Sequence, residues 1–283
     1  MKNLFKSIFI ALFPMLALYV LIDSSLHLFQ HDFSFRYLGR LVTALTIAIL
    51  FAGLFIVSQA RTSKNLNIYT VFIVFGFLIS IVLGGVIENN DLIGSSMSFI
   101  LVVCWIVYLK WYSVFEKRSN SILKIGNILP NFKLEDTDKN KVSNSSFLGN
   151  PTIYLFYRGN WCPLCMAQIK EIAAQYKELE QRGINMVLIS PQPHGYSKNL
   201  AKKHNVGFTF LTDTQNNVAK QLNIFAKNGI PTGFQAFGYD SDTVLPTVII
   251  TDANGKIVFA DLTDNYRVRP EPETFLKIID ALR

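Results

Sequence analysis

The sequence contains little that could bind a metal ion or a nucleic acid. Only three of its 283 residues are cysteine and four are histidine. Two of the cysteines are three residues apart and could form half of a zinc site. The third, Cys104, lies in a distant apolar segment, so His194 and His204 would have to complete the site by folding. The net charge is +7, yet there is no basic stripe with interleaved aromatic residues. We therefore expect no metal and no nucleic acid partner.

Charged side chains are also scarce, at 17% of the chain, while 50% of the residues are hydrophobic. This imbalance predicts a membrane part. Four apolar stretches precede residue 116, and each is close to the roughly 20 residues that a helix needs to cross a bilayer. They cover about residues 4–22, 41–60, 68–87 and 92–109. We predict an all-α membrane domain of four transmembrane helices over residues 1–115, a linker over 116–126 and a soluble domain over 127–283.

The first apolar stretch has no clear small-residue cleavage site and precedes further spans, so we expect it to be retained. Basic residues that flank the spans predict the orientation, because cytoplasmic loops carry an excess of Lys and Arg. With four spans, the termini and the soluble domain face the cytoplasm of a multi-pass protein, as in a bacterial inner membrane. One miscounted span would place the soluble domain outside. The cytoplasmic set is Lys2, Lys6, Arg61, Lys64, Lys110, Lys117, Arg118 and Lys124, against Arg36 and Arg40 on the other side.

The apolar half holds no transport or cofactor motif. Asp23 and His27, at the far end of the first stretch, could form a proton or ligand site or be ordinary interfacial polar residues. Gly84 and Gly85 could let two helices approach closely.

A Cys-x-x-Cys pair marks the stretch of the soluble half in which we expect chemistry. The preceding residues 152–156 predict a buried strand, and residues 166–182 predict a helix. Cys162 would lie at or beside the helix N-cap, with Pro163 at the first helical position. The unpaired N–H groups and partial positive charge of a helix start stabilise a thiolate, which is the reactive form of cysteine.

The second cysteine of the pair, Cys165, lies one turn further on the same helix face. The two sulfurs could therefore close a disulfide with little backbone movement. Two other interpretations stay open, half of a zinc site or a pair of inert buried cysteines. The order strand, Cys-x-x-Cys and helix favours redox chemistry.

The rest of the soluble half alternates between predicted strands and helices, which indicates a central mixed sheet with helices on both faces. A hairpin is expected before the central strand, and the Asn254-Gly255 turn predicts a second one near the end. Residues 225–242 predict an irregular insertion. The other expected strands are 129–134, 141–143, 184–190, 208–211, 245–251 and 256–261, and the other expected helices are 197–204, 216–222 and 272–282.

Three motifs in this half are specific. They are F-Y-R-G-x-W-C-P-x-C at 156–165, L-P-T at 245–247 followed by D-x-N-G-K at 252–256, and Y-x-V-R-P-E-P at 266–272. With them, residues from about 128 to the end resemble the peroxiredoxin-like alkyl hydroperoxide reductase/thiol-specific antioxidant family, a redoxin branch of the thioredoxin fold. The resemblance implies a thioredoxin-like α/β fold, peroxide or disulfide substrates, thioredoxin or a similar dithiol as reductant, and no bound cofactor. It does not extend to the apolar half.

The resemblance also implies roles for single residues. Cys162 takes the place of the attacking cysteine and Cys165 that of the second cysteine of a thioredoxin-type pair. Pro246 matches the cis-proline that faces such a pair, although a proline that merely starts a strand is the alternative. The family carries Thr or Ser three residues before the attacking cysteine, where this chain has Gly159.

The family also carries an arginine near the start of the late strand, about where Pro246 stands here. Arg158, and with less support Arg267 or Arg269, could supply that positive charge, or they could be solvated surface residues. Trp161 would shield the sulfur and form part of a docking surface.

Three functions fit these patterns. The first is a membrane-anchored thiol peroxidase, an antioxidant oxidoreductase that reduces peroxides through a Cys162–Cys165 redox disulfide; the Arg158-Gly159 context and the C-terminal motif favour it. The second is a thioredoxin-type thiol–disulfide oxidoreductase that acts on protein disulfides, which the Cys-x-x-Cys spacing and Pro246 favour. The third is a membrane sensor whose redox domain only signals.

Overall fold

The computed structural model describes residues 2–88, 96–116, 118, 120–204 and 206–281. The chain divides into two compact units, each with its own core. An apolar helical unit comprises Ile8–Val57 and Thr62–Phe115, and a sheet-containing unit comprises Glu116–Arg283 with Met1–Ser7 and Ser58–Arg61.

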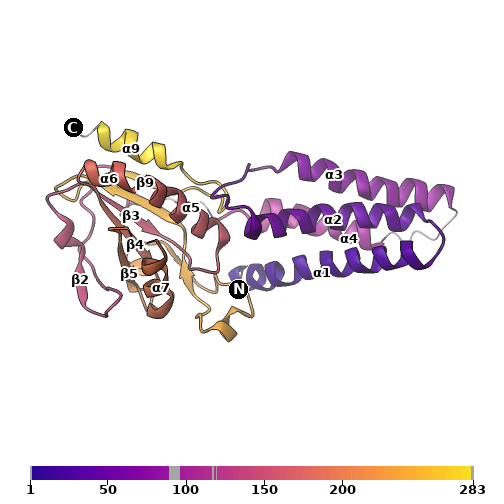
Figure 1. Cartoon of the computed structure of the whole chain (residues 1–283), viewed down its shortest axis with the longest axis horizontal. Helices are drawn as coiled ribbons and strands as arrows, with labels where there is room; N and C mark the ends of the chain where they lie inside the picture. Colours follow the sequence, from indigo (N-terminus) through magenta and orange to yellow (C-terminus); the bar gives the residue numbers. More distant parts are fainter. Residues whose placement is uncertain (1, 89–95, 117, 119, 205, 282–283) are drawn as a thin grey trace. The chain divides into compact units, whose positions relative to one another are not determined.

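The helical unit is a bundle whose core includes Phe13, Ile47, Leu50, Trp105 and Tyr108. Its helices run side by side in Figure 1. The first three are long and apolar enough to cross a membrane. The elements are α1 (Lys2–Gln30), α2 (Phe35–Ile56), α3 (Asn67–Leu78) with the π-helix η1 (Ile79–Ile87), and α4 (Ser96–Val107) with the π-helix η3 (Tyr108–Tyr112).

The predicted fourth span was wrong in its extent. The last apolar helix covers only Ser96–Tyr112, which is shorter than the other three, and its predicted start at Leu92 lies outside the described residues. Within the described part of the chain there are three candidate spans rather than four. The predicted orientation requires an even number of spans and therefore stays a prediction.

Small residues let α2 pack closely against α3 and η1. A Cβ atom on Gly39 would lie 2.4 Å from the carbonyl oxygen of Gly76 and 2.4 Å from the backbone nitrogen of Ser80. The Thr43 hydroxyl lies at the same seam and donates to the carbonyl of Gly39 at 2.9 Å. Close backbone packing through small residues is typical of helix pairs in membranes.

The two polar residues singled out in the first apolar stretch lie within α1, which continues past Ile22. Asp23 lies 3.6 Å from the guanidinium of Arg40. The His27 ring stacks on Tyr37 with the centroids 3.5 Å apart. Both residues therefore contact α2, and the question of a ligand site there stays open.

The second unit contains a mixed sheet of seven strands in the order β2-β1-β5-β4-β3-β8-β9. Strands β3, β4 and β5 are parallel, and the β1–β2 and β8–β9 pairs are antiparallel. Figure 1 shows α5, α6 and α9 along one side of the sheet. The strands are β1 (Lys133–Glu135), β2 (Lys141–Ser143), β3 (Thr152–Phe156), β4 (Asn185–Ser190), β5 (Thr209–Thr212), β8 (Thr247–Thr251) and β9 (Ile257–Asp261).

This is the helix-flanked mixed sheet that the sequence predicts, and both predicted hairpins are present. The predicted helix over 166–182 is broken at Gln175 into two helices. Part of the predicted linker packs into the unit, because Leu123 lies in the core under the sheet. The helices are α5 (Pro163–Ala174), α6 (Tyr176–Gln181), α7 (His194–His204), α8 (Asn217–Gln221) and α9 (Pro272–Asp280).

The predicted irregular insertion between α8 and β8 contains a second, small sheet. Strands β6 (Phe225–Ala226) and β7 (Thr243–Val244) pair antiparallel. Between them lies the 3-10 helix η5 (Phe234–Phe237). This insertion contributes aromatic residues next to the cysteine pair.

Candidate active site

The cysteine pair lies at the start of α5, just after the loop that connects β3 to this helix. Cys162 is the N-cap residue and Pro163 occupies the first helical turn, as the sequence predicts. The Sγ atoms of Cys162 and Cys165 are 2.7 Å apart, and both cysteines are free. Cys162 is 3% exposed and Cys165 is fully buried. The two sulfurs are therefore close enough to share a proton and to form a disulfide.

The positive charge beside the pair comes from Arg269. Its Nη2 lies 3.4 Å from Cys165 Sγ and 3.9 Å from Cys162 Sγ. The Nη1 group donates to Gln168 Oε1 at 2.8 Å and Nε donates to the Tyr266 carbonyl at 3.2 Å. Arg269 is only 6% exposed. A guanidinium held by these two hydrogen bonds is fixed against the sulfurs.

Arg158, the first candidate for this charge, contributes less of it than Arg269: the charges of both lower the pKa of Cys162, and that of Arg269 lowers it more. The guanidinium carbon of Arg158 lies 4.6 Å from the Trp161 ring centroid, and its guanidinium donates to the Gly229 carbonyl. The backbone N–H of Arg158 also acts on the pair, because it lowers the pKa of Cys165. Arg267 is fully buried, with its backbone N–H donating to Asn265 Oδ1 at 3.0 Å.

Trp161 forms part of an aromatic cover together with the insertion. Its ring lies 5.5 Å from that of Phe234 between centroids. Phe234 in turn contacts Phe237 and Tyr239, and Tyr239 stacks on Tyr196 at 4.9 Å. Phe237 is 66% exposed. The sequence marked Trp161 but not its partners, because their positions in an irregular loop have no period.

Pro246 precedes β8, whose first residue, Thr247, pairs with the last residue of β3, Phe156. The peptide bond before Pro246 is trans, so the expected cis-proline was wrong. The Pro246 carbonyl accepts a hydrogen bond from Arg118 Nη1 at 3.0 Å, and Thr247 Oγ1 accepts one from Arg118 Nη2 at 2.5 Å. Burial lowers the pKa of Arg118 to about 10. The segment expected to be a linker thus holds the start of β8.

The surroundings change the pKa values of the two thiols in opposite directions: that of Cys162 is raised and that of Cys165 is lowered. Burial raises the pKa of Cys162, and the hydrogen bond shared with Cys165 adds to this. Burial also acts to raise the pKa of Cys165, but the hydrogen bond with Cys162 and the charge of Arg269 outweigh it and lower the pKa to about 5. At neutral pH the pair therefore holds one proton and one negative charge.

Two glutamines that the sequence analysis missed organise this region. Gln168, one turn after Cys165, holds Arg269. Gln192 is 2% exposed; its Oε1 accepts from the Asn160 backbone at 2.8 Å and its Nε2 donates to the Tyr157 hydroxyl at 3.0 Å. Gln192 thereby fixes the loop before the cysteines. A lone glutamine between two prolines gives no sequence signal.

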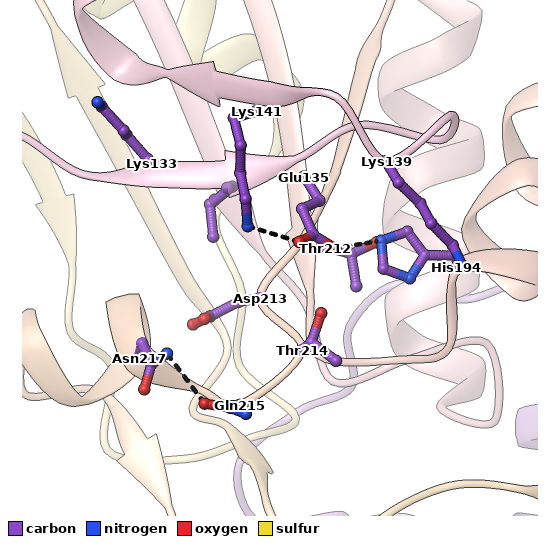
Figure 2. Close-up of a pocket in the computed structure, with 11 residues that line it drawn as sticks. Lys133, Glu135, Lys139, Lys141, His194, Thr212, Asp213, Thr214, Gln215 and Asn217 are labelled. Carbon is purple, nitrogen blue, oxygen red and sulfur yellow. Dashed lines mark hydrogen bonds and ion pairs between the residues drawn. The ribbon is translucent and has the colours of Figure 1, made fainter.

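A separate polar pocket of about 490 Å³ lies at the edge formed by β1, β2 and β5. Figure 2 shows Glu135 bonded to both Lys141 and His194, at 2.5 and 2.9 Å. Asp213 accepts the backbone N–H groups of Val218 and Ala219 at the start of α8. Its acids are thus occupied by contacts within the fold, and no cysteine lines it.

The chain is similar to curated proteins in its sheet-containing unit. The AhpC/TSA family model matches residues 125–260. Peroxiredoxin Q of Sedum lineare is 31% identical over 173 residues, which cover 59% of this chain and 84% of that protein. Peroxiredoxin Bcp of Escherichia coli K12 is 29% identical over 147 residues, 51% of this chain and 90% of that protein.

Other relatives are matched over different shares. Thiol-disulfide oxidoreductase ResA of Bacillus subtilis is 28% identical over 139 residues, 48% of this chain and 73% of that protein. The chain spans about half the length of the chloroplastic peroxiredoxin Q proteins of wheat and rice, 46% and 56%. The crystal structure of peroxidoxin BcpB from Mycobacterium tuberculosis has a TM-score of 0.46 at 19% identity and covers 56% of this chain and 98% of that one.

The mixed sheet and the dithiol at the start of α5 define a thioredoxin-fold protein of the peroxiredoxin type. The chain belongs to the AhpC/TSA family, as its similarity to the Sedum lineare peroxiredoxin establishes.

Proposed function

We propose that this chain is a membrane-anchored thiol peroxidase whose redox pair is Cys162 and Cys165. The observation that carries the proposal is the buried guanidinium of Arg269 within 4 Å of both sulfurs. A cation at this distance favours a thiolate, and the thiolate is the nucleophile. Membership of a family with peroxiredoxin relatives supports the same chemistry.

The reaction follows from these groups. A thiolate of the pair attacks one oxygen of a hydroperoxide, the O–O bond breaks, and the leaving oxygen takes a proton as water or an alcohol. The sulfur becomes a sulfenic acid. The other cysteine attacks that sulfur, so that a disulfide forms and water leaves. An external dithiol, such as thioredoxin, then reduces the disulfide through a mixed disulfide and is itself oxidised.

The other proposed site residues support the pair. Arg158 anchors the insertion and gives its backbone N–H to Cys165. Trp161 covers the sulfurs with its aromatic neighbours. Pro163 starts α5 at the position where its missing N–H costs nothing. Pro246, held by Arg118, fixes the start of β8 next to β3.

The test is stopped-flow oxidation of the reduced full chain in lipid nanodiscs by hydrogen peroxide. We expect oxidation well above the rate of a free thiol, lost in the double variant Cys162→Ser/Cys165→Ser. Cys104→Ser is the matched control, because Cys104 lies in α4 of the other unit, and should keep the full rate. Oxidation no faster than that of free cysteine would overturn the proposal.

A second candidate is a thiol–disulfide oxidoreductase acting on protein disulfides. The spacing of the pair at a helix start favours it, and the ResA relative is named for this activity. Slow reaction with peroxide combined with rapid exchange against a disulfide substrate in the same apparatus would assign the chain to this class.

We also propose that the apolar helices anchor the chain in a membrane, as in a bacterial inner membrane, with the sheet-containing unit on the cytoplasmic side. The basic residues that flank the helices support this side only when the shorter helix Ser96–Tyr112 also crosses, because three crossings would place the two termini on opposite sides. Lipid bilayer, peroxide and a dithiol reductant are then the partners of the chain, with no nucleic acid among them.

A further inference from the structure

The insertion that covers the cysteine pair also holds the start of α1. Ser7, which is 7% exposed, donates its hydroxyl to the Ile230 carbonyl at 2.6 Å, and this hydroxyl lies 2.9 Å from that of Thr232. One turn earlier in α1, the Asn3 side-chain amide donates to the Lys227 carbonyl at 2.9 Å. The first residues of α1 therefore belong to the same compact unit as the insertion.

The sequence of α1 places Ser7 at the surface of a bilayer. The helix has an uncharged run over residues 7–22, with Lys6 before it and Asp23 after it. At about 1.5 Å per residue this run extends for about 24 Å, somewhat less than the roughly 30 Å of a hydrocarbon core. When this run crosses the membrane, Ser7 therefore lies at one edge of the hydrocarbon. Lys6 can extend its ammonium from there into the headgroup layer.

The segment bound to Ser7 is uncharged and has an exposed aromatic turn. Residues 228–239 include no Lys, Arg, Asp or Glu. Within them, η5 carries Phe234 and Phe237, whose ring centroids are 6.1 Å apart, and Phe237 is 66% exposed. Phe234 follows Thr232 by two residues, so it lies at most about 7 Å further along the chain. The contact with Ser7 therefore holds this turn close to the edge of the hydrocarbon core.

We propose that η5 is an interfacial anchor, whose side chains Phe234 and Phe237 insert into the headgroup layer of the bilayer that α1 crosses. The inference rests on the membrane anchoring proposed above. An apolar element that lies in this layer is buried about 5–10 Å deep. The patch binds lipid rather than a soluble protein, because the hydrogen bonds to Ser7 keep the insertion at the membrane surface.

The same insertion contacts the loop before the cysteines. The Phe234 ring lies 5.5 Å from that of Trp161 between centroids. The guanidinium of Arg158 donates to the Gly229 carbonyl, and the Thr243 hydroxyl donates to the Arg158 carbonyl at 3.1 Å. Lipid contact at η5 therefore places the cover of the cysteine pair at the bilayer surface.

The test uses the full chain with a nitrobenzoxadiazole label on single introduced cysteines, after all three native cysteines are replaced by serine. Each labelled protein is placed in phosphatidylcholine nanodiscs whose lipids carry a doxyl quencher either near the headgroup or near the chain end. Phe237→Cys is the test site. Met15→Cys, 64% exposed in the uncharged run of α1, reports insertion of that helix. Leu148→Cys, 53% exposed and in the stretch before β3, is the matched control. Thermal unfolding verifies that each protein is folded.

We expect the headgroup-side doxyl group to quench the label at position 237 roughly twofold, because an interfacial side chain lies at the depth of that group. The chain-end doxyl group should quench the label at position 15 more strongly than that at 237. Neither lipid should quench the label at position 148.

Quenching at 15 without quenching at 237, or equal quenching at 237 and 148, would overturn the interfacial anchor and leave the membrane anchoring standing. Absence of quenching at 15 would overturn the membrane anchoring itself, and the interfacial anchor with it. A label at 237 that neither lipid quenches, and whose emission changes only on addition of thioredoxin, would assign the patch to a dithiol protein instead.

Discussion

Arg269 is a buried cation, and its position suits it to pair with a thiolate of Cys162 or Cys165. A guanidinium cannot be deprotonated in proteins, so its burial needs an anion or several hydrogen bonds. Here it has a carbonyl, an amide oxygen and two sulfurs. In return, its charge offsets the cost of a buried thiolate.

Replacing Arg269 should raise the pKa of the thiolate. The ordinary cysteine pKa is about 8.5, and that of Cys165 is lowered to about 5, so thiolate absorbance in the wild type should persist at pH 6 and fall as the pH drops through about 5. In Arg269→Met the midpoint should lie about one to three pH units higher. Ultraviolet titration in the Cys104→Ser background measures this.

Arg182→Met is the matched control for that titration. Arg182 pairs with Asp280 at 2.8 Å on the surface between α6 and α9, away from the cysteines in sequence. Its replacement should leave the thiolate midpoint in place. An Arg269→Met midpoint equal to that of the wild type would show that hydrogen bonds alone hold the thiolate.

Residue identity alone could not select Arg269 over Arg158. The C-terminal motif containing Arg269 was recognisable, but nothing in it states that the chain folds back across α5. Arg158, only four residues before Cys162, appeared the nearer candidate. Its side chain instead leans on Trp161, because the insertion supplies a carbonyl for it to bind.

At the scale of elements, strands were the most predictable part. β3 and β4 are runs of apolar residues buried on both faces, and parallel central strands have this pattern. The break at Gln175 and the short strands of the insertion were not predictable, because tertiary contacts rather than local propensity decide them. The trans bond before Pro246 was not predicted either, because the expected cis bond came from the family resemblance and not from a residue pattern of this chain.

The close approach of α2 to α3 should depend on Gly39. A methyl group there would meet backbone atoms at 2.4 Å, whereas one on Gly53, in the same helix, would meet nothing within 4 Å. Gly39→Ala should therefore destabilise the helical unit by about 1–3 kcal/mol, while Gly53→Ala should be neutral or stabilising by up to about 1 kcal/mol. Thermal unfolding in detergent compares Gly39→Ala with Gly53→Ala. Equal effects of the two substitutions would mean that close packing of α2 against α3 at Gly39 does not stabilise the helical unit.

At the scale of the whole molecule, composition alone predicted an apolar N-terminal half followed by a half of ordinary composition, and the structure has a helical unit and a sheet-containing unit. The number of spans was not predicted, because within the described residues the last apolar helix covers Ser96–Tyr112, which is shorter than the other three. Hydropathy counts apolar residues, whereas crossing a bilayer depends on the length of the helix that they form.

The side of the membrane depends on whether the shorter helix Ser96–Tyr112 also crosses, and it can be measured. A reporter that is active only outside the cytoplasm, fused after residue 283, should be inactive if both ends are cytoplasmic. The same reporter inserted at residues 31–34, between α1 and α2, should be active and serves as the control. Activity at the C-terminal fusion would place the redox unit outside, where disulfides persist.

The burial of Arg269 also affects the reduction potential of the cysteine pair. Oxidation to the disulfide removes the negative charge from sulfur, but the guanidinium beside it stays charged and buried. The oxidised state therefore lacks the thiolate that balances part of this cation's charge in the reduced state. Because this raises the free energy of the disulfide relative to the dithiol, it makes the reduction potential of the pair more positive. The arginine that activates the thiolate thus also makes the disulfide easy for an external dithiol to reduce.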